Sequence, residues 1–441
     1  MLRRIDLSGE IAGYPVRALR GLMPRPELDV NAALAQIQPL MDDIAHRGKA
    51  AVVEAVERFD GVRLEHLRVP ESAIKAAVEG LAPELRRAYL TSIERVRAAH
   101  EAQRLPDVVS EVAPGGTVTE RYLPVGRVGL YAPGGLAVLA SSVIMNAVPA
   151  QIAGVESIAL STPAQKTNGG LPDQGILAVA GLLGVDEVYA VGGPAAVAMF
   201  TYGAVAEDGT VECEPVDMIT GPGNVYVTAA KRAVRGLVGT DAEAGTTEIA
   251  IIADAGADPV HVAVDLISQA EHDPAAASVL ITDSAALADA VDAELERRAP
   301  QARHADRVLT ALKGEQSGTI LVADVDEAVA VADAYAAEHL EVQTANAREV
   351  ALRVRNAGAI FVGAYSPVSL GDYCAGSNHV LPTGGCARHS AGLSVHTFLR
   401  AVHVIDYSRE ALEAVAADVV VFAESEDLPS HGEAVSARFA P

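Results

Sequence analysis

The chain has 441 residues, half of them apolar, which is enough to build two or more packed domains. Its formal net charge of −24 argues against nucleic acid as a partner, since that needs a basic face, and the acidity favours solubility. No apolar run is long enough to span a bilayer, the first ten residues lack a signal-peptide core, and the three cysteines have neither paired nor CxxC spacing. These features predict a cytoplasmic globular protein with no membrane partner.

The N-terminal quarter is predicted to be an arm followed by helices. Residues 1–26 show no periodicity, whereas residues 30–103 carry apolar side chains at helical spacing, broken once at residues 59–62. After Pro114 the period changes to that of strands. Residues 116–135 predict two strands that end in a glycine turn.

The rest of the chain alternates between helical and strand patterns in two series. The first series starts near residue 137 and the second after Thr247. Alternation of this kind predicts parallel sheets of the doubly wound type, so we expect two α/β domains. The predicted strands lie at residues 157–163, 187–193, 216–221, 248–254, 277–283, 318–324 and 357–363.

Gln269 and His272 lie one turn apart at the end of a predicted helix. This helix begins at Asp258, a favourable N-cap followed by proline, and Pro274 forces it to stop near His272. A divalent cation there would lie at the negative end of the helix dipole. Imidazole suits Zn²⁺, although an amide oxygen is a less usual ligand. The pair fits either part of a metal site or a polar helix end.

Glu338 and His339 are adjacent within residues 326–342, which carry a helical pattern. Neighbouring side chains of a helix point about 100° apart, so both reach one pocket only if the helix ends there. A Glu beside a His can supply two proton-transfer groups with different pKa values. A chance pair is the alternative. Cys374 fits either a nucleophile or a small buried thiol.

Residues 371–388 form the stretch with the densest set of polar side chains. It places Asp372, Asn378 and His379 within eight residues and lacks the periodicity of a helix or a strand. We predict an ordered functional loop held by the strand that precedes it, with a solvated surface turn as the alternative. Four glycines suit unusual backbone angles or a close approach to a ligand: Gly371, Gly376, Gly384 and Gly385.

Two glycine turns could hold a phosphate. Residues 131–135 and 220–224 each follow a predicted strand and precede a helix, where backbone N–H groups can face an anion. No GxGxxG motif occurs, so neither turn alone identifies a nucleotide site. From spacing alone, the sequence supports a metal-assisted enzyme of the α/β class.

Taken together, the motifs resemble those of the histidinol dehydrogenase family over almost the whole chain. Each motif is short, and it is their common order that makes the resemblance specific. In chain order they are VGLYAPGG, ITGPGNVYVTAAKR, ISQAEHDP, AYAAEHLEV, GDYCAGSNHVLPTGGCAR and SHGEAV.

The resemblance implies two incomplete Rossmann-like parallel-sheet domains, with a small N-terminal arm, a C-terminal tail and an intertwined homodimer. Residues 27–130 and 247–393 would form the larger domain, which holds the metal and catalytic residues. Residues 131–246 would form the second domain on the NAD side. Residues 1–26 would be the arm, and residues 394–441 a tail that reaches the partner subunit.

The resemblance also implies the reaction, which is the last step of histidine biosynthesis. The family oxidises L-histidinol to L-histidine through L-histidinal and reduces two NAD⁺, with one Zn²⁺ per subunit. His339 would take the alcohol proton, and Glu338 would activate water against the aldehyde. The implied zinc ligands are Gln269, His272, Asp372 and His431, the last from the partner subunit.

Further contacts are carried over from the family in the same way. Tyr131 and Asn224 fall on positions that contact NAD. The implied substrate-binding positions are Thr247, Gln269, His272, Glu338, His339, Asp372, His379, Glu426 and His431.

The chain departs from the family pattern at two places. Thr247 stands in AGTTE where the family has the serine of AGPSE, so a hydroxyl is kept with an added methyl group. Ala195 follows VGGP where the family often has a glutamine just after VGG, which places one cofactor hydrogen bond in question.

Three other functions fit parts of the pattern. A related dehydrogenase could act on another amino alcohol, although His379 and Glu426 match the family on the substrate side. An NAD-independent zinc hydrolase could use Glu338 as the base on metal-bound water. A zinc-stabilised dimer scaffold would need no catalytic residue, and mutation of Glu338 would have no catalytic consequence.

Overall fold

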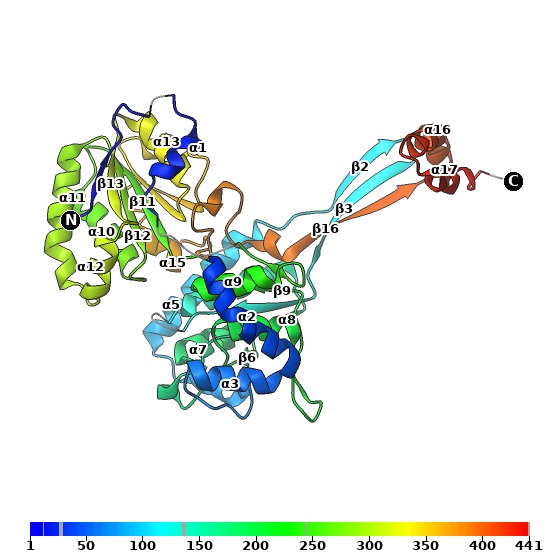
Figure 1. Cartoon of the computed structure of the whole chain (residues 1–441), viewed down its shortest axis with the longest axis horizontal. Coiled ribbons are helices and arrows are strands. Elements are labelled where there is room, and N and C mark those ends of the chain that lie inside the picture. Colours follow the sequence, from blue (N-terminus) through cyan, green and yellow to red (C-terminus); the bar gives the residue numbers. More distant parts are fainter. Residues whose placement is uncertain (12, 26–29, 135–137, 243–244, 440–441) are drawn as a thin grey trace.

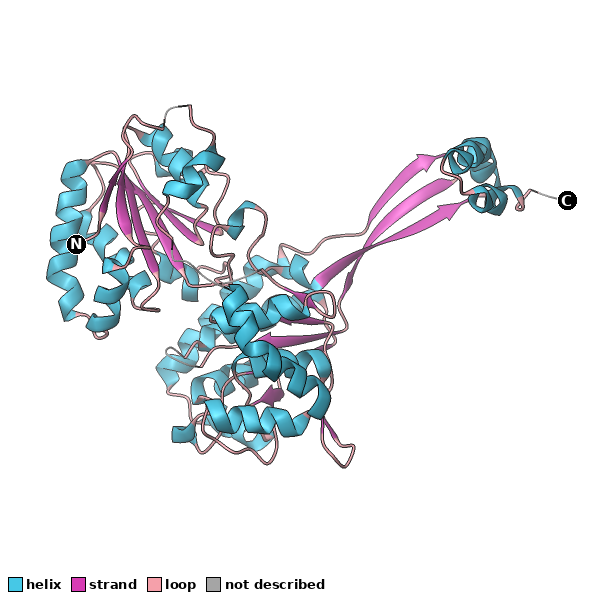
Figure 2. Ribbon diagram, viewed as in Figure 1, coloured by secondary structure: helices cyan, strands magenta, loops and turns pink. Residues whose placement is uncertain are grey.

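The computed structural model describes residues 1–11, 13–25, 30–134, 138–242 and 245–439. Figures 1 and 2 show two α/β lobes and a long three-stranded arm that reaches away from them and carries two helices at its tip. Within the described ranges, none of the helices combines the length and the apolar character that crossing a membrane requires. Ala244 and Gly135, which belong to two of the sequence motifs, lie outside the described residues.

The first lobe is built on a six-stranded parallel sheet in the order β1-β13-β12-β11-β14-β15. Side chains alternate between its two faces. On β11, Ala250 and Ile252 belong to one hydrophobic cluster, while Ile249 and Ile251 belong to another. The central strands are therefore buried on both faces, as expected for a parallel sheet covered by helices.

The strands of this sheet are β1 (Arg4–Asp6), β11 (Glu248–Ala253), β12 (Ala277–Thr282), β13 (Gly318–Leu321), β14 (His339–Gln343) and β15 (Ala359–Val362). Its helices are α1 (Val16–Leu19), α10 (Pro259–Ala270), α11 (Ala285–Arg298), α12 (Ala305–Lys313), α13 (Val325–Tyr335), α14 (Ala347–Ala351) and α15 (Val368–Tyr373), with short 3₁₀ turns η1 (Arg20–Leu22) and η3 (Ala299–Gln301).

The second lobe is built on a five-stranded parallel sheet in the order β10-β9-β4-β5-β6. Its strands are β4 (Arg127–Tyr131), β5 (Ser157–Ser161), β6 (Glu187–Tyr189), β9 (Met218–Thr220) and β10 (Gly239–Thr240). The other elements are α6 (Ala140–Ala153), η2 (Lys166–Asn168), α7 (Gln174–Leu182), α8 (Gly193–Tyr202), α9 (Val225–Val234) and the hairpin β7 (Ala204–Val205) and β8 (Val211–Cys213).

The N-terminal helices pack on this second lobe. Side chains from residues 33–96 share one hydrophobic core with the five-stranded sheet, and α2 packs directly on α8 and α9. The expected grouping of residues 27–130 with 247–393 is therefore wrong for these helices, because their apolar faces are buried against the other sheet. They are α2 (Val30–Arg47), α3 (Lys49–Phe59), α4 (Glu71–Glu79) and α5 (Pro83–Glu101).

The arm is an antiparallel sheet in the order β16-β3-β2. Its strands are β2 (Val108–Ala113), β3 (Gly116–Pro124) and β16 (Leu399–Tyr407), and its tip carries α16 (Arg409–Ser425) and α17 (Pro429–Ser436). Two 3₁₀ turns precede β16, namely η4 (Cys386–Arg388) and η5 (Val395–Phe398). The C-terminal tail is thus anchored by a full-length strand pairing with β3.

The α/β architecture with two parallel sheets is confirmed, and three local expectations are corrected. Residues 4–6 of the N-terminal segment form an edge strand, because they pair with β13. The helical pattern of residues 326–342 ends at Tyr335, and its last part is strand β14, buried at every position. A short helix, α15, begins the loop region and includes Asp372. Strand β15 lies at a sheet edge and is only partly buried.

Candidate active site

The candidate site lies at the amino ends of the strands of the six-stranded sheet. Thr247 and Glu248 stand at the start of β11, and Glu338 and His339 at the start of β14. Three helices, α10, α13 and α15, end beside these residues. Because the carboxyl end of a helix carries partial negative charge, this edge of the sheet favours a cation.

A sharp turn brings Glu338 and His339 to this edge. Helix α13 ends at Tyr335, and Ala336 adopts a left-handed backbone with φ of 51°. His339 then enters β14 opposite Ile249 of β11. The helix therefore ends before this pair, which is the condition under which both side chains can reach one pocket.

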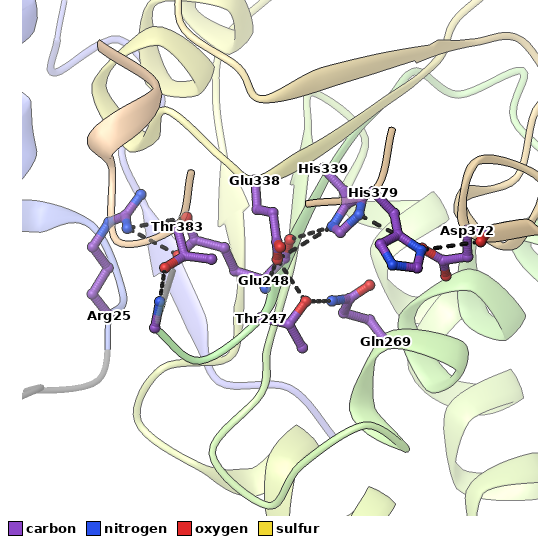
Figure 3. Close-up of polar contacts among 10 residues, drawn as sticks. Arg25, Thr247, Glu248, Gln269, Glu338, His339, Asp372, His379 and Thr383 are labelled. Carbon is purple, nitrogen blue, oxygen red and sulfur yellow. Dashed lines mark hydrogen bonds and ion pairs between the residues drawn. The ribbon is translucent and has the colours of Figure 1, made fainter. Parts of the chain in front are cut away.

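Glu338 is held by a directed set of hydrogen bonds (Figure 3). Its Oε2 accepts from the Thr247 hydroxyl at 2.5 Å and from the backbone N–H of Glu248 at 2.9 Å. The Thr247 hydroxyl in turn accepts from the side-chain amide of Gln269. Thr247 was expected to contact substrate; in the structure its hydroxyl connects Gln269 to Glu338.

His339 is held in one tautomer. Its Nδ1 lies 3.2 Å from the backbone oxygen of Glu248, and a carbonyl can only accept, so Nδ1 carries the proton. Nε2 is buried without a hydrogen-bond partner among the described residues and lies 4.0 Å from Asp372 Oδ1. A buried nitrogen left in this way costs free energy until a ligand pairs with it. The ring is therefore oriented to accept a proton from a bound molecule.

The charges of Glu338 and His339 depend on one another. Burial alone would lower the pKa of His339, but the charge and hydrogen bond of Glu338, and then the charge of Asp372, raise it to about 9. Burial would raise the pKa of Glu338, but the charge of His339 and the surrounding hydrogen bonds hold it below its usual value. Nδ1 of His339 lies 3.4 Å from Glu338 Oε2, so the two groups titrate as a pair.

The loop that carries Asp372 and His379 is ordered and bridges the lobes. The side-chain amide of Asn378 donates to the backbone oxygen of Met145 on α6 at 2.6 Å. Gly376 has φ of 95°, and a Cβ there would lie 2.8 Å from the backbone oxygen of Arg95 on α5. The glycine thus has the unusual backbone angle inferred from the sequence, and the close approach it permits is to the backbone of α5.

Both ring nitrogens of His379 are occupied in this structure. Nδ1 donates to the backbone oxygen of Asp372 at 3.0 Å, and Nε2 lies 3.3 Å from the hydroxyl of Ser142 on α6. Burial lowers the pKa of His379 against the charge of Asp372, so the neutral ring is favoured. A ligand that uses Nε2 must first displace Ser142, a residue that the sequence patterns did not single out.

Three donors of the expected zinc shell come from this chain. The amide nitrogen of Gln269 donates to Thr247, and its oxygen points toward the side of the site where Asp372 lies (Figure 3). His272 follows the last turn of α10 and is partly exposed, and α10 neighbours α15. A carboxylate, an imidazole and an amide oxygen fit a borderline cation such as Zn²⁺ and leave a fourth position to fill.

The structure does not bring Glu426 and His431 to this site within one chain. Both are exposed at the tip of the arm, where they line a small apolar hollow between α16 and α17 with Phe422 and Leu428. Figure 1 shows these two helices at the far end of the arm from the six-stranded lobe. Accordingly, no group of three or more His, Cys, Asp or Glu side chains placed to hold a metal occurs in the described part of the chain.

The residues expected on the NAD side lie at the carboxyl edge of the five-stranded sheet, where ligands of α/β folds commonly bind. Tyr131 ends β4 and is buried, which raises its pKa to about 12, and its hydroxyl oxygen accepts from the Gly193 N–H at 3.1 Å. Asn224 is exposed and caps α9 through its Oδ1. Ala195 is buried in α8 and offers only a methyl group.

Fold and site together define an α/β enzyme with a buried, mutually coupled Glu–His pair beside an edge that favours a cation. The sequence model of histidinol dehydrogenase matches residues 23–439. The chain belongs to the histidinol dehydrogenase family, and it is accordingly an oxidoreductase of histidine biosynthesis.

Individual relatives agree over the full length. The histidinol dehydrogenase of Streptomyces avermitilis is 60% identical over 440 residues, covering 100% of this chain and 98% of the relative. That of Nocardia farcinica is 59% identical over 438 residues, covering 99% and 98%. The crystal structure of histidinol dehydrogenase from Elizabethkingia anophelis superposes with a TM-score of 0.89 at 30% identity, covering 99% of this chain and 98% of that one.

Proposed function

We propose that this chain oxidises L-histidinol to L-histidine through bound L-histidinal, reduces two NAD⁺ and holds one Zn²⁺ per subunit. The observation that carries the proposal is the buried Glu338–His339 pair. Nε2 of His339 has no hydrogen-bond partner among the described residues and lies 4.0 Å from Asp372 Oδ1. Family membership supports the substrate and the class of reaction.

In the first oxidation His339 is the base. Its Nε2 takes the hydroxyl proton of the alcohol while hydride leaves the same carbon for the nicotinamide ring of NAD⁺. The Nδ1–H bond to the backbone of Glu248 holds the ring in the tautomer that leaves Nε2 free. The products of this step are the aldehyde, NADH and a protonated His339.

In the second oxidation Glu338 removes a proton from water as the water oxygen attacks the aldehyde carbon. The resulting hydrate anion loses hydride to a second NAD⁺ and becomes the carboxylic acid, whose remaining proton passes to the neutral His339 to leave the carboxylate. Once His339 has released its proton, the charge that lowers the pKa of Glu338 is gone, and burial then favours protonation of the carboxylate. The basicity of Glu338 is thus set by the state of His339.

Gln269, His272 and Asp372 would hold the cation, with His431 of the partner subunit completing the shell. When bound, the cation would chiefly orient the substrate, which is a contribution of proximity rather than of redox chemistry. In this proposal the substrate side is formed by His379 of the same chain and by Glu426 of the partner subunit. Tyr131 and Asn224 belong to the NAD side, where Ala195 offers no polar contact.

An intertwined homodimer is supported by the arm. Several of its large apolar side chains are exposed in one chain, including Val109 at 66%, Ile405 at 71%, Val421 at 67% and Phe422 at 66%. Large apolar side chains left exposed on one projecting part of the chain suit a surface that another protein covers. A second copy that covers the arm would also carry His431 to a site that lacks its fourth ligand.

The test is NADH formation by the purified protein with L-histidinol and NAD⁺. NADH should form with L-histidinol and only weakly with amino alcohols that lack the imidazole, since a site built to bind that ring rejects analogues without it. Preference for another amino alcohol would favour the related-dehydrogenase alternative. Hydrolysis of an ester or amide without NAD⁺ would favour the hydrolase.

We expect the rate of the first oxidation to rise with pH. Because the pKa of His339 is raised to about 9, its Nε2 is protonated below that pH and the ring becomes a base as pH rises; a cation on Asp372 offsets part of this shift. In Glu338→Gln the main cause that raises the pKa is lost, so the ascending limb should move to lower pH. Single-turnover rates of NADH formation against pH measure both profiles. If the ascending limb of the pH–rate profile lay at the same pH in Glu338→Gln as in wild type, His339 and Glu338 would not titrate as a pair.

A further inference from the structure

Arg25 reaches the site from the N-terminal segment (Figure 3). Its Nη1 donates to both carboxylate oxygens of Glu248, at 3.2 and 2.9 Å, and its Nη2 donates to the backbone oxygen of Tyr335. The guanidinium carbon also lies 4.2 Å from the centre of the Tyr335 ring. Glu248 is 2% exposed, so Arg25 supplies the opposite charge that a buried carboxylate needs.

The main chain of Glu248 holds both members of the catalytic pair. Its N–H donates to Glu338 at 2.9 Å, and its carbonyl accepts from His339 at 3.2 Å. The side chain of Glu248 faces away from that pair, toward Arg25. The position of the first residue of β11, and with it the orientation of both reacting side chains, therefore depends on an ion pair made with the N-terminal segment.

The second contact of Arg25 lies on the other side of the pair. Tyr335 is the last residue of α13, and Ala336 after it has the left-handed backbone that turns the chain toward Glu338. A non-glycine residue in that conformation is unfavourable unless neighbouring structure holds it. The hydrogen bond from Arg25 to the backbone oxygen of Tyr335 holds the residue at the start of this turn.

We propose that Arg25 is a positioning residue for Glu338 and His339. One planar guanidinium holds the start of β11 through Glu248 and the end of α13 through Tyr335, which are the two elements that fix the pair. An ammonium group lacks this rigid set of donors, so lysine cannot replace arginine here. The N-terminal segment is thereby part of the active site, although no motif of the sequence marks it.

This inference rests on the proposed function, and its test compares Arg25→Lys and Arg25→Met with wild type in single-turnover assays. Both oxidations, histidinol to histidinal and histidinal to histidine, should slow by a similar factor, about 10-fold for lysine and about 100-fold for methionine, as expected for reacting groups displaced by about 1 Å. The KM for NAD⁺ and the zinc content should not change, because Arg25 contacts neither site.

Arg4→Met is the matched control. Arg4 also belongs to the N-terminal segment and also forms an ion pair, at 3.0 Å to Asp289 and 2.7 Å to Asp292 on α11. It should lower the melting temperature with little effect on either rate. Glu248→Gln, which keeps the shape of the side chain and removes the charge to which Arg25 binds, should slow both oxidations as Arg25→Lys does.

The outcomes distinguish a failure of the proposed function from a failure of the proposed role of Arg25. If wild type does not oxidise L-histidinol, the proposed function fails. The state of His339 then still tests the inference, since ¹⁵N histidine spectra recorded above its pKa of about 9, where the ring is neutral, report Nδ1 protonation in wild type and its loss in Arg25→Met without any turnover. If wild type is active and Arg25→Lys is folded with both rates unchanged, or loses rate only as much as Arg4→Met does, Arg25 is structural and the inference is wrong.

Discussion

Glu338→Gln should slow the conversion of L-histidinal to L-histidine by about 10³-fold, within the usual range for loss of a general base. Glutamine keeps an oxygen that can accept from the Thr247 hydroxyl and the Glu248 N–H, so the site should remain packed. It cannot take a proton from water. The oxidation of L-histidinol should be much less affected, because His339 is its base and Nε2 remains free.

The measurement is stopped-flow NADH formation from L-histidinol and, separately, from L-histidinal. The variant should give one rapid equivalent of NADH from L-histidinol and then a slow phase. Thr247→Ser is the control, since it keeps the hydroxyl that joins Gln269 to Glu338 and should retain near-normal rates for both steps. Oxidation of L-histidinal at the wild-type rate by Glu338→Gln would remove Glu338 from the role of base.

Mixing two inactive variants, His339→Ala and His431→Ala, should restore activity in heterodimers. His339 lies in the six-stranded lobe, whereas His431 is exposed at the tip of the arm. If each site takes His339 from one chain and His431 from the other, every heterodimer contains one intact site. Random exchange makes about half of the dimers heterodimers, each with one of two sites working, so about a quarter of wild-type activity should return.

The subunit exchange is verified by native mass spectrometry of one isotopically labelled variant. The His431→Ala variant alone should also lose zinc, whereas the His339→Ala variant should keep it, because His431 is a proposed zinc ligand and His339 is not. A mixture of His431→Ala with His272→Ala should behave in the same way. In each heterodimer one metal site carries both substitutions, whereas the other site keeps all four proposed ligands. Verified exchange without recovered activity would mean that the site is not shared between subunits.

The sequence predicts most of this fold because its periodicities are strong. Helix α10 carries its own start signal in Asp258 and Pro259, and β11 and β12 are continuous apolar runs flanked by turn residues. Strand β14 was missed because HLEVQ continues the helical spacing of α13. Only residues 336–338 separate the two elements, and the sequence carries no signal for the left-handed turn at Ala336. Strand β1 is three residues long and exists only through its pairing with β13.

The sequence motifs identify several residues of the site but do not predict how these residues are arranged in space. Glu338, His339, Gln269 and Asp372 come together because three helices end and two strands begin at one edge of the sheet, which no local pattern encodes. Contacts through the main chain, such as those made by Glu248, leave no side-chain signature. Arg25 and Ser142 reach the site from distant segments, so nothing in their sequence neighbourhood identifies them.

The most direct test of the central claim is the ratio of NADH to L-histidine formed from L-histidinol by purified protein, before and after chelation. The proposed mechanism predicts two NADH for each L-histidine, loss of both products with the chelator and their return when Zn²⁺ is added. A ratio of one, with free L-histidinal as the product, would contradict the bound two-step oxidation. No NADH from a folded, zinc-loaded sample would contradict the dehydrogenase activity itself.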